Sequence, residues 1–432
     1  MGEPEDDDGE HGPTDAQITS AIAVLEASRA LPPDDPRFLA LEAAAAHLRK
    51  ATKRKRRLER ARATAAHDRA VRASTELARE RGMDGAASGG TRTLRERDCY
   101  VCKRPYRDID ARYHLLCPTC AARSGAMRDL RLDLAGRRAL VTGGRVKIGH
   151  ATALRLLRAG AEVVVTTRFP TDAAARFAEA PDHADWAHRL AIHGLDFRRL
   201  GDVLEAIAAF RDGPPLDILV NNAAQTVWHA PSWYADLLAG ESAPPALPVT
   251  VWSPPGREHA LEPLARLVTV DGERVPSWVM ELEDVPPSEL VECQVVNAIV
   301  PALLCSRLLP AFRRSPFPDR YIVNVAALEG QFAREKLSRH PHTNMAKAAL
   351  AMLTATSASG YAKHGVHMVS VDPGWMSHEA PEEAAERARA GGFHPPLDAE
   401  DAAVRILHPI ALGLDGRPVS GVLLKDFDVV PW

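Results

Sequence analysis

The stretch from Arg138 to Gly149 constrains the fold of this chain more than any other part of the sequence. A short apolar run, Ala139–Val141, predicts a buried strand, and it breaks at Thr142-Gly143-Gly144. From Ile148 onward, apolar residues recur at helical spacing. A strand, a glycine turn and a helix in this order direct free backbone N–H groups toward an anion. The stretch therefore predicts a phosphate-binding turn, with a loop that holds no ligand as the alternative.

Three further strands are predicted, each followed by a polar residue. Glu162–Thr167 precedes Arg168, Leu190–Leu195 precedes Asp196, and Leu216–Val220 precedes Asn221-Asn222-Ala223. Dinucleotide folds bind the adenosine ribose at the end of the second strand, with an acid for a 2′-hydroxyl or an arginine for a 2′-phosphate. Because that end carries Arg168 and no acid, we predict NADP rather than NAD. The alternative is an ordinary surface arginine.

These motifs resemble the short-chain dehydrogenase/reductase (SDR) superfamily, and the resemblance covers roughly residues 134–424. It implies an α/β fold with a Rossmann-type doubly wound parallel sheet. Lys147 replaces the middle glycine of the family's turn, which resembles the pteridine-reductase-like branch that prefers NADPH. The loop containing Pro373 and Gly374 resembles the family's loop beside the nicotinamide. The resemblance implies cofactor contacts from Thr142, Gly143, Gly144, Arg145, Lys147, Ile148, Gly149, Arg168, Asp196, Asn221, Ala223, Lys347, Pro373 and Gly374.

The expected catalytic residues depart from the family pattern. Asn297 resembles the helix asparagine of the proton relay, and Lys347 resembles the catalytic lysine. The family's serine position holds Ala326-Ala327, and Thr343 stands where the tyrosine should be. An aliphatic hydroxyl is far less acidic than a phenol, whose pKa is ~10. The usual serine and tyrosine mechanism is therefore not expected, and His340, His342 or a lysine-bound water are the alternative proton donors.

A long insertion separates the fourth strand from Asn297. Seventy-two residues lie between Ala224 and Asn297, and the proline-rich part at about 226–286 contains four of the seven tryptophans. Ligands bind in α/β sheets at the carboxyl ends of strands, where this insertion begins. It is interpreted as a lid or a partner surface, with an accessory subdomain as the alternative.

Two cysteine pairs precede the dinucleotide-binding region. Fourteen residues separate Cys99-Tyr-Val-Cys102 from Cys117-Pro-Thr-Cys120. Two CxxC pairs at this spacing predict a structural zinc site with four thiolate ligands. The alternative is a pair of redox dithiols. Packing of the tyrosines on a very small core is expected in the loop between the pairs.

The N-terminal region combines opposite charges. Residues 1–14 are acidic, Ala16–Arg29 predicts a helix capped by Thr14 or Asp15, and a longer helix or hairpin partner follows to about Met83. Nine Lys or Arg lie between Arg49 and Arg62 against one Glu. This run indicates an anionic partner such as nucleic acid, or else a solvated helix or pairing with the acidic tail. We expect a tail and basic helical region at 1–94, a zinc module at 95–127 and the dinucleotide domain at 128–432.

Bulk properties narrow the functional classes. The 432 residues carry a net charge of −3, and 46% are apolar, which suffices for a sizeable core. No transmembrane segment or signal peptide is predicted, and the six cysteines suit a reducing cytoplasm. A homo-oligomer is expected through the helices of Asn297 and Lys347. The hypotheses are an NADP(H)-dependent reductase of a carbonyl or imine, a catalytically inactive cofactor sensor or scaffold, and a nucleic-acid-associated protein.

Overall fold

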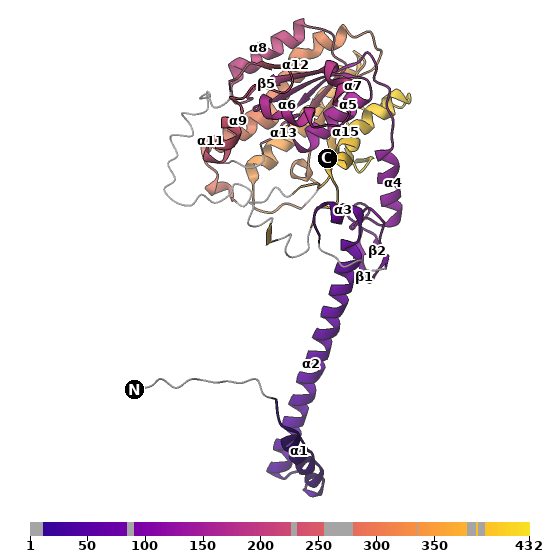
Figure 1. The fold of residues 1–432 in the computed structure, drawn as a ribbon, viewed down its shortest axis with the longest axis vertical. Helices are drawn as coiled ribbons and strands as arrows, with labels where there is room; N and C mark the ends of the chain where they lie inside the picture. Colours follow the sequence, from indigo (N-terminus) through magenta and orange to yellow (C-terminus); the bar gives the residue numbers. More distant parts are fainter. Residues whose placement is uncertain are drawn as a thin grey trace, which may run out of the picture. The chain divides into compact units, whose positions relative to one another are not determined.

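The computed structural model describes residues 12–83, 90–225, 231–254, 280–333, 335–377, 386–387 and 394–432. The chain divides into two compact units, Met1–Ala70 and Val71–Trp432. Figure 1 labels the elements along the chain.

The first unit is a helical hairpin. Helix α1 (Asp15–Ala27) begins with a capping box between Thr14 and Gln17, and a 3₁₀ turn, η1 (Ser28–Ala30), follows it. Helix α2 (Pro36–Ala73) continues without a break for 38 residues into the second unit. The predicted first helix and its Thr14 cap are confirmed. The second helix ends ten residues before Met83, because the hydroxyls of Ser74 and Thr75 bond to the carbonyls of the last helical turn.

A small cysteine-containing module begins the second unit. After α3 (Glu76–Glu80), strands β1 (Arg92–Asp98) and β2 (Pro105–Asp108) pair antiparallel, and α4 (Pro118–Arg128) follows. Tyr106, Tyr113 and Leu116 are buried in one cluster that also contains Leu397. The expected packing of the loop tyrosines is confirmed, and Leu397 shows that the module shares its core with the dinucleotide domain.

The described residues of the second unit also form a nine-stranded sheet. Every neighbouring pair is parallel except the last pair, at the C-terminal edge. In sheet order the strands are β11 (Asp428–Val430), β10 (Leu423–Lys425), β9 (Val366–Asp372), β8 (Arg320–Val325), β6 (Ile218–Asn221), β3 (Arg138–Thr142), β4 (Glu162–Thr167), β5 (Leu190–Gly194) and β7 (Val249–Val251).

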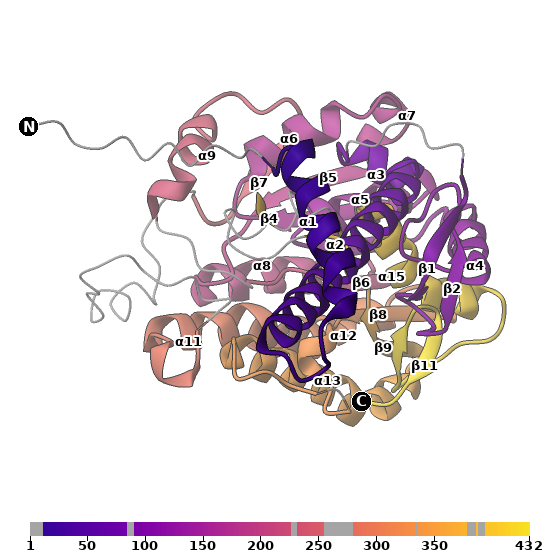
Figure 2. The same ribbon diagram turned by 90° about the horizontal axis from the view of Figure 1, so that it is seen from below.

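Helices cover both faces of this sheet (Figures 1 and 2). One hydrophobic cluster joins α5 (Lys147–Arg158), α6 (Pro170–Ala178) and α15 (Ala399–Leu414) to the strand residues on their side. A second cluster joins α8 (Leu200–Asp212), α12 (Val300–Arg313) and α13 (Pro341–Ala362). Successive residues of β3 alternate between the clusters, as strand geometry requires: Ala139 and Val141 face one and Leu140 the other. The predicted Rossmann-type doubly wound sheet is confirmed.

Short elements complete the described chain. They are α7 (His183–Trp186), η2 (Ala187–Arg189), η3 (Pro231–Tyr234), α9 (Ala235–Gly240), η5 (Leu282–Asp284), α11 (Pro287–Gln294), the π-helical segment η6 (Val295–Ile299) and η7 (Leu328–Gly330).

The described part of the insertion contributes to the sheet. Strand β7 extends the sheet beside β5, and the Trp252 indole donates to His193 Nδ1 at 2.9 Å. These contacts tie residues 249–252 to the dinucleotide domain. Trp228 and Trp278 lie outside the described residues.

One continuous helical stretch, Pro287–Arg313, is long and apolar enough to span a bilayer, with a mean hydropathy of 1.7. Its most apolar window is 56% buried within the protein, as in the core helix of a folded domain.

Candidate active site

The glycine turn between β3 and α5 is tightly packed. A Cβ on Gly144 would lie 2.7 Å from Val165 Cβ, and one on Gly149 would lie 2.1 Å from the Gly143 oxygen. Gly143 itself has a φ of +69°, and a Cβ there would meet Ala223 at 2.9 Å. These approaches explain why glycine is needed at all three positions.

The N-terminus of α5 has no side-chain cap, because its N-cap residue is Val146. Its first residue, Lys147, has a φ of +52° and an exposed side chain. A left-handed conformation costs a non-glycine residue ~1 kcal/mol or more, and a cation opposes the dipole at a helix N-terminus. Uncapped amides beside a cation held in a strained conformation are suited to binding an anion.

Asn222 holds the turn in place. Its side-chain amide donates to the carbonyls of Thr142 and Gly143 at 2.9 and 3.2 Å. The Thr142 hydroxyl accepts the backbone N–H groups of Asn222 and Ala223 at 3.0 and 2.9 Å. These hydrogen bonds therefore hold the carboxyl end of β3 against the carboxyl end of β6. Asn222 is absent from the predicted contact residues, although it lies inside a motif that was recognised.

Arg168 lies at the end of β4 against the insertion. Its guanidinium donates to Tyr234 Oη at 3.2 Å and lies 4.9 Å from the centre of that ring. Glu241, also from the insertion, accepts the N–H groups of Thr171 and Asp172 at 2.9 Å each, so its carboxylate caps the N-terminus of α6. The insertion thus contacts the strand end where the adenosine ribose is expected.

Other predicted cofactor residues have partners within the protein. Arg145 pairs with Asp172 at 2.8 Å. Asp196 is buried, which opposes its ionisation, but its ion pair with Arg198 lowers its pKa. The Asn221 side chain donates to Asn324 Oδ1 at 2.8 Å.

Asn324 continues the network of Asn221 inside the sheet. Asn324 donates to Thr354 Oγ1 at 2.8 Å, and that hydroxyl lies 2.8 Å from Ser370 Oγ. All these side chains are buried. The network joins β6, β8 and β9 to α13, so it fixes the helix that carries Thr343 and Lys347.

Asn297 lies in the π-helical segment η6, a rare distortion that often occurs at functional sites. Its side chain accepts from Gln225 N at 2.7 Å and donates to Gln225 O at 2.9 Å. Its amide nitrogen also lies 3.2 Å from Cys293 Sγ. Cys293 in turn lies 4.0 Å from Thr343 Oγ1. The fold therefore brings a thiol between the two predicted catalytic positions, and sequence reasoning missed it.

Thr343 and Lys347 are one turn apart on α13, and both are buried. Lys347 Nζ donates to the Val325 carbonyl at 2.9 Å, and desolvation lowers its pKa. Burial raises the pKa of the Cys293 thiol to about 11. Burial lowers the pKa of His342 to about 4, so its ring is neutral near pH 7. His342 Nε2 lies 3.7 Å from Glu289 Oε1.

The loop residues Pro373 and Gly374 follow β9 directly. Asp372, the last strand residue, accepts the Gly374 N–H at 2.9 Å through its own side chain. Gly374 has a φ of +86°, which favours glycine. The carboxyl ends of β3, β4, β5, β6, β8 and β9, together with the helices that follow them, thus carry all the predicted cofactor and catalytic positions.

Comparison with known proteins identifies this arrangement. A family model for short chain dehydrogenases matches residues 137–236, which contain the glycine turn, Arg168 and the Asn221-Asn222-Ala223 motif. The match assigns this dinucleotide-binding region to the short-chain dehydrogenase/reductase superfamily.

Individual relatives are similar over different lengths. Uncharacterized protein R665 of Acanthamoeba polyphaga mimivirus is 33% identical over 338 residues, covering 73% of this chain and 71% of that protein. A protein of Streptomyces lividans named "Probable oxidoreductase" is 44% identical over 92 residues, which are 21% of this chain and 30% of that protein. The structure of the Pseudomonas aeruginosa RhlG/NADP complex is 22% identical, covers 68% of this chain and 95% of that one, and has a TM-score of 0.46.

Strand β8, which precedes the expected position of the serine, continues its pairing with β9 beyond Val325. Ala326 N donates to the Val371 carbonyl at 2.8 Å, so it extends the pairing of β8 with β9. Ala327 follows and begins the short 3₁₀ turn η7. Neither alanine offers a hydroxyl, and the position of Thr343 offers only an aliphatic one.

The four cysteines of the preceding module come together. The sulfurs of Cys99, Cys102, Cys117 and Cys120 all lie within 4.8 Å of one another, and those of Cys102 and Cys117 are 3.8 Å apart. Four sulfurs about 2.3 Å from a tetrahedral zinc would lie about 3.8 Å from each other. The cluster therefore has dimensions that suit a tetrahedral metal ion.

Proposed function

We propose that this SDR protein is an NADP(H)-dependent oxidoreductase that acts on a carbonyl or imine group through an atypical active site. The observation that carries the proposal is the N-terminus of α5, which has no side-chain cap, follows Gly143 and Gly144, and contains the sterically required Gly149 in its first turn. Arg168 at the end of β4 supports the choice of NADP, because a guanidinium can bind a phosphate through two hydrogen bonds. Lys147 supports a place in the pteridine-reductase-like branch, since its cation lies at the same helix terminus.

A bound nicotinamide would supply the hydride, and the protein has to position the substrate and supply a proton. Asn297 fixes the backbone of Gln225 just beyond β6. His340 and His342 are poor proton sources, because burial lowers the pKa of both imidazoles and leaves them neutral near pH 7. The thiol of Cys293 is also a poor proton source, because burial raises its pKa. Lys347 remains, since its lowered pKa makes its ammonium a better donor than an exposed lysine.

Substrate panels with two matched variants test this assignment. NADPH oxidation is measured with carbonyl and imine compounds, and cofactor affinity is measured separately by fluorescence. We expect Lys347→Met to abolish turnover and Thr343→Val to leave most of it. Turnover that persists in Lys347→Met would show that the active site is wrongly placed.

A catalytically inactive cofactor sensor or scaffold is the alternative function. It is favoured by the hydrogen bond that engages Lys347 Nζ with a backbone carbonyl and by the missing serine and tyrosine. This alternative predicts tight NADPH binding with no turnover of any compound. The same panel and binding measurement therefore distinguish the two functions.

We further propose that the four-cysteine cluster holds one structural zinc ion. The sulfur separations suit it, and the small core of the module would gain a cross-link between β1, β2 and α4. Elemental analysis of the protein purified from a metal-supplemented culture should give one zinc per chain. Redox dithiols would instead give no metal and a reducible disulfide.

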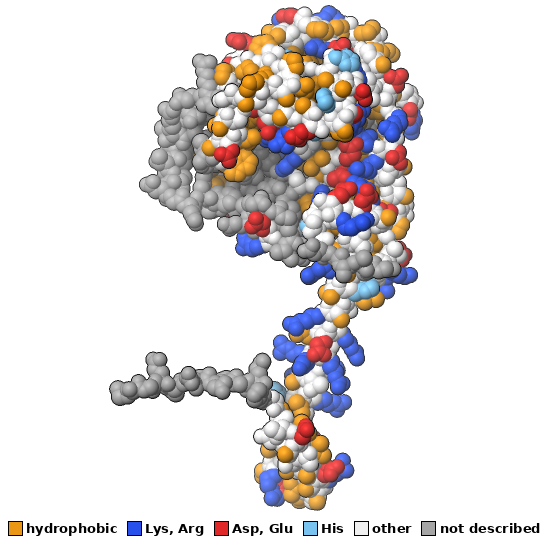
Figure 3. Space-filling view, viewed as in Figure 1, with side chains coloured by type: hydrophobic (Ala, Val, Ile, Leu, Met, Phe, Trp, Pro, Cys, Tyr) orange, Lys and Arg blue, Asp and Glu red, His pale blue; other side chains and the backbone are white. Residues whose placement is uncertain are grey.

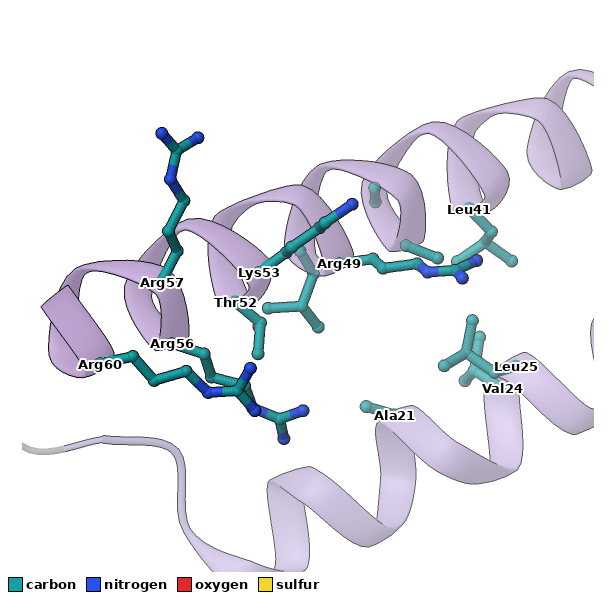
Figure 4. Close-up of a pocket in the computed structure, with 13 residues that line it drawn as sticks. Ala21, Val24, Leu25, Leu41, Arg49, Thr52, Lys53, Arg56, Arg57 and Arg60 are labelled. Atoms are coloured by element: carbon teal, nitrogen blue, oxygen red, sulfur yellow. The ribbon is translucent and has the colours of Figure 1, made fainter. Parts of the chain in front are cut away.

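The hairpin of α1 and α2 is proposed to bind an anionic partner, specifically an acidic amphipathic helix of another protein. A groove of about 1020 Å³ separates the two helices (Figure 4). Val24, Leu25, Leu41 and Leu48 line its apolar part. Its basic residues are Arg49, Lys53, Arg56, Arg57 and Arg60. A partner must therefore offer both apolar and acidic side chains, which a nucleic acid does not.

The remaining cations of the run provide a matched control for the groove. All nine basic side chains from Arg49 to Arg62 are exposed, and Figure 3 shows blue side chains around this helix. Arg56→Glu with Arg60→Glu reverses charges in the groove, and Lys50→Glu with Arg54→Glu reverses charges outside it. Anisotropy with a labelled acidic amphipathic peptide should lose affinity only for the first pair. Binding of a labelled DNA duplex that both pairs weaken equally would favour a nucleic-acid partner instead.

Self-association is proposed through α13 and the helix of Asn297. Ile299, Met345 and Met352 are 44%, 51% and 60% exposed, an unusual set of apolar side chains on two neighbouring helices. A second copy would cover them. A cytoplasmic location is proposed because four clustered thiols stay reduced there.

A further inference from the structure

Tyr100 connects the cysteine module to the loop that follows β9. It lies inside the first CxxC pair, between Cys99 and Cys102. Its phenol oxygen accepts the backbone N–H of Trp375 at 2.9 Å. Its own backbone N–H donates to the Leu115 carbonyl at 2.9 Å. The side chain is therefore anchored at one end within the module and bonded at the other end to the loop.

The loop contacted by Tyr100 is the one that carries Pro373 and Gly374. Its first residue, Asp372, is held by Lys425 Nζ at 2.6 Å and by Gln331 Nε2 at 3.1 Å. A Cβ on Gly374 would lie 3.4 Å from Tyr100 Oη. The loop thus packs between the end of the sheet and the tyrosine hydroxyl.

Two further contacts attach the chain on either side of this loop. Arg81, which follows α3, donates to the carbonyls of Met376 and Pro395 at 3.0 and 2.7 Å. Leu397, whose backbone N–H donates to Trp375 O at 3.2 Å, is fully buried in the hydrophobic cluster of the module. The residues on both sides of segment 378–393 are therefore attached to the module and to α3.

The attachment of the module itself does not depend on Tyr100. Tyr113 Oη donates to Asp401 at 2.6 Å, and Arg112 pairs with Asp398 at 2.6 Å. Both acids belong to the capped N-terminus of α15. A change confined to the Tyr100 hydroxyl should therefore leave the module docked on the dinucleotide domain.

We propose that the cysteine module is a support for the loop Asp372–Ser377 and that Tyr100 is its positioning residue. A metal bound by the cysteines would fix the backbone on both sides of Tyr100, and so metal loading would set the position of Trp375 and Gly374. This proposal rests on the proposed function in one respect: the loop borders the nicotinamide only if the cofactor binds as inferred above. The structure thereby gives the module a role in cofactor and substrate binding rather than in stability alone.

The test is amide hydrogen exchange at Trp375 in the full-length, metal-loaded protein without cofactor. Tyr100→Phe removes only the accepting oxygen, and exchange at Trp375 should become about three- to tenfold faster, as for the loss of one hydrogen bond. The matched control is Tyr106→Phe. The Tyr106 hydroxyl is buried in the same module and has no hydrogen-bond partner among the described residues. This control should leave exchange at Trp375 unchanged.

Metal content and cofactor affinity complete the experiment. Both variants should keep one metal per chain, and only Tyr100→Phe should weaken NADPH binding. Unchanged exchange at Trp375 in Tyr100→Phe would overturn the supporting role. Faster exchange at Trp375 without NADPH binding by any form of the protein would uphold the support and refute the cofactor assignment instead.

Discussion

Replacing Arg168 with alanine should remove most of the preference for NADPH over NADH. The guanidinium carries five N–H donors and uses one of them on Tyr234 Oη at 3.2 Å. Enough donors remain for a bidentate contact with a 2′-phosphate. A charge-assisted contact of this kind is worth about 1.5–3 kcal/mol, which corresponds to a preference of about ten- to 150-fold.

The ratio of the two dissociation constants isolates this contact. Arg168→Ala also removes the interaction with the Tyr234 ring, but that loss affects both cofactors and cancels in the ratio. Fluorescence titration with NADPH and NADH gives both constants, and added salt should weaken the binding of NADPH more than that of NADH, because NADPH carries the additional 2′-phosphate. The matched control is Arg176→Ala, which removes an exposed arginine paired with Asp172 on the following helix.

Two results would refute this reasoning. Equal affinity for NADPH and NADH in the unmodified protein would exclude a 2′-phosphate site at Arg168. A preference that survives Arg168→Ala would transfer the site to another cation at the same edge, such as Lys147 or Arg145, whose guanidinium lies 5.4 Å from the centre of the neighbouring Phe169 ring.

Four further predictions follow from the described contacts. Cys117→Ser should lower the metal content from one ion per chain to near zero and unfold the module, as measured by elemental analysis and circular dichroism. Thr343→Tyr combined with Ala327→Ser should raise the rate of NADPH-dependent reduction, by up to about 10²-fold if the new hydroxyls reach the substrate. A rate below that of the unmodified protein would contradict this prediction. Met352→Asp should shift the species seen by light scattering toward monomer, and an unchanged mass would argue against α13 as the interface. Stability to urea should fall as the pH drops from about 6.5 to about 4. His342 and three other histidines have pKa values lowered to about 4 in the folded protein, so the unfolded chain binds more protons in that pH range. Equal urea midpoints at pH 7 and pH 5 would contradict this.

The sequence alone determined the elements that depend on local patterns. The strand Glu162–Thr167 was predicted with the bounds that the structure gives it, since an apolar run between turn residues marks a buried strand. The cap of α1 by Thr14 follows from residues three positions apart. The glycine turn was recognisable because three glycines at this spacing have a steric cause, which the close approaches of Gly144 and Gly149 now show.

Only the tertiary structure decided which distant residues meet. Cys293 lies beside Thr343 although 50 positions separate them, and Arg168 lies against Tyr234 across 66 positions. Tyr100 bonds to Trp375 across 275 positions. No periodicity in the sequence encodes these pairs, because they depend on the order of the strands and on the surfaces where the insertion and the cysteine module pack. The sequence therefore indicated which residues stand at the strand ends, whereas the thiol of Cys293 beside Thr343 and the hydrogen bond between Tyr100 and Trp375 required the folded chain.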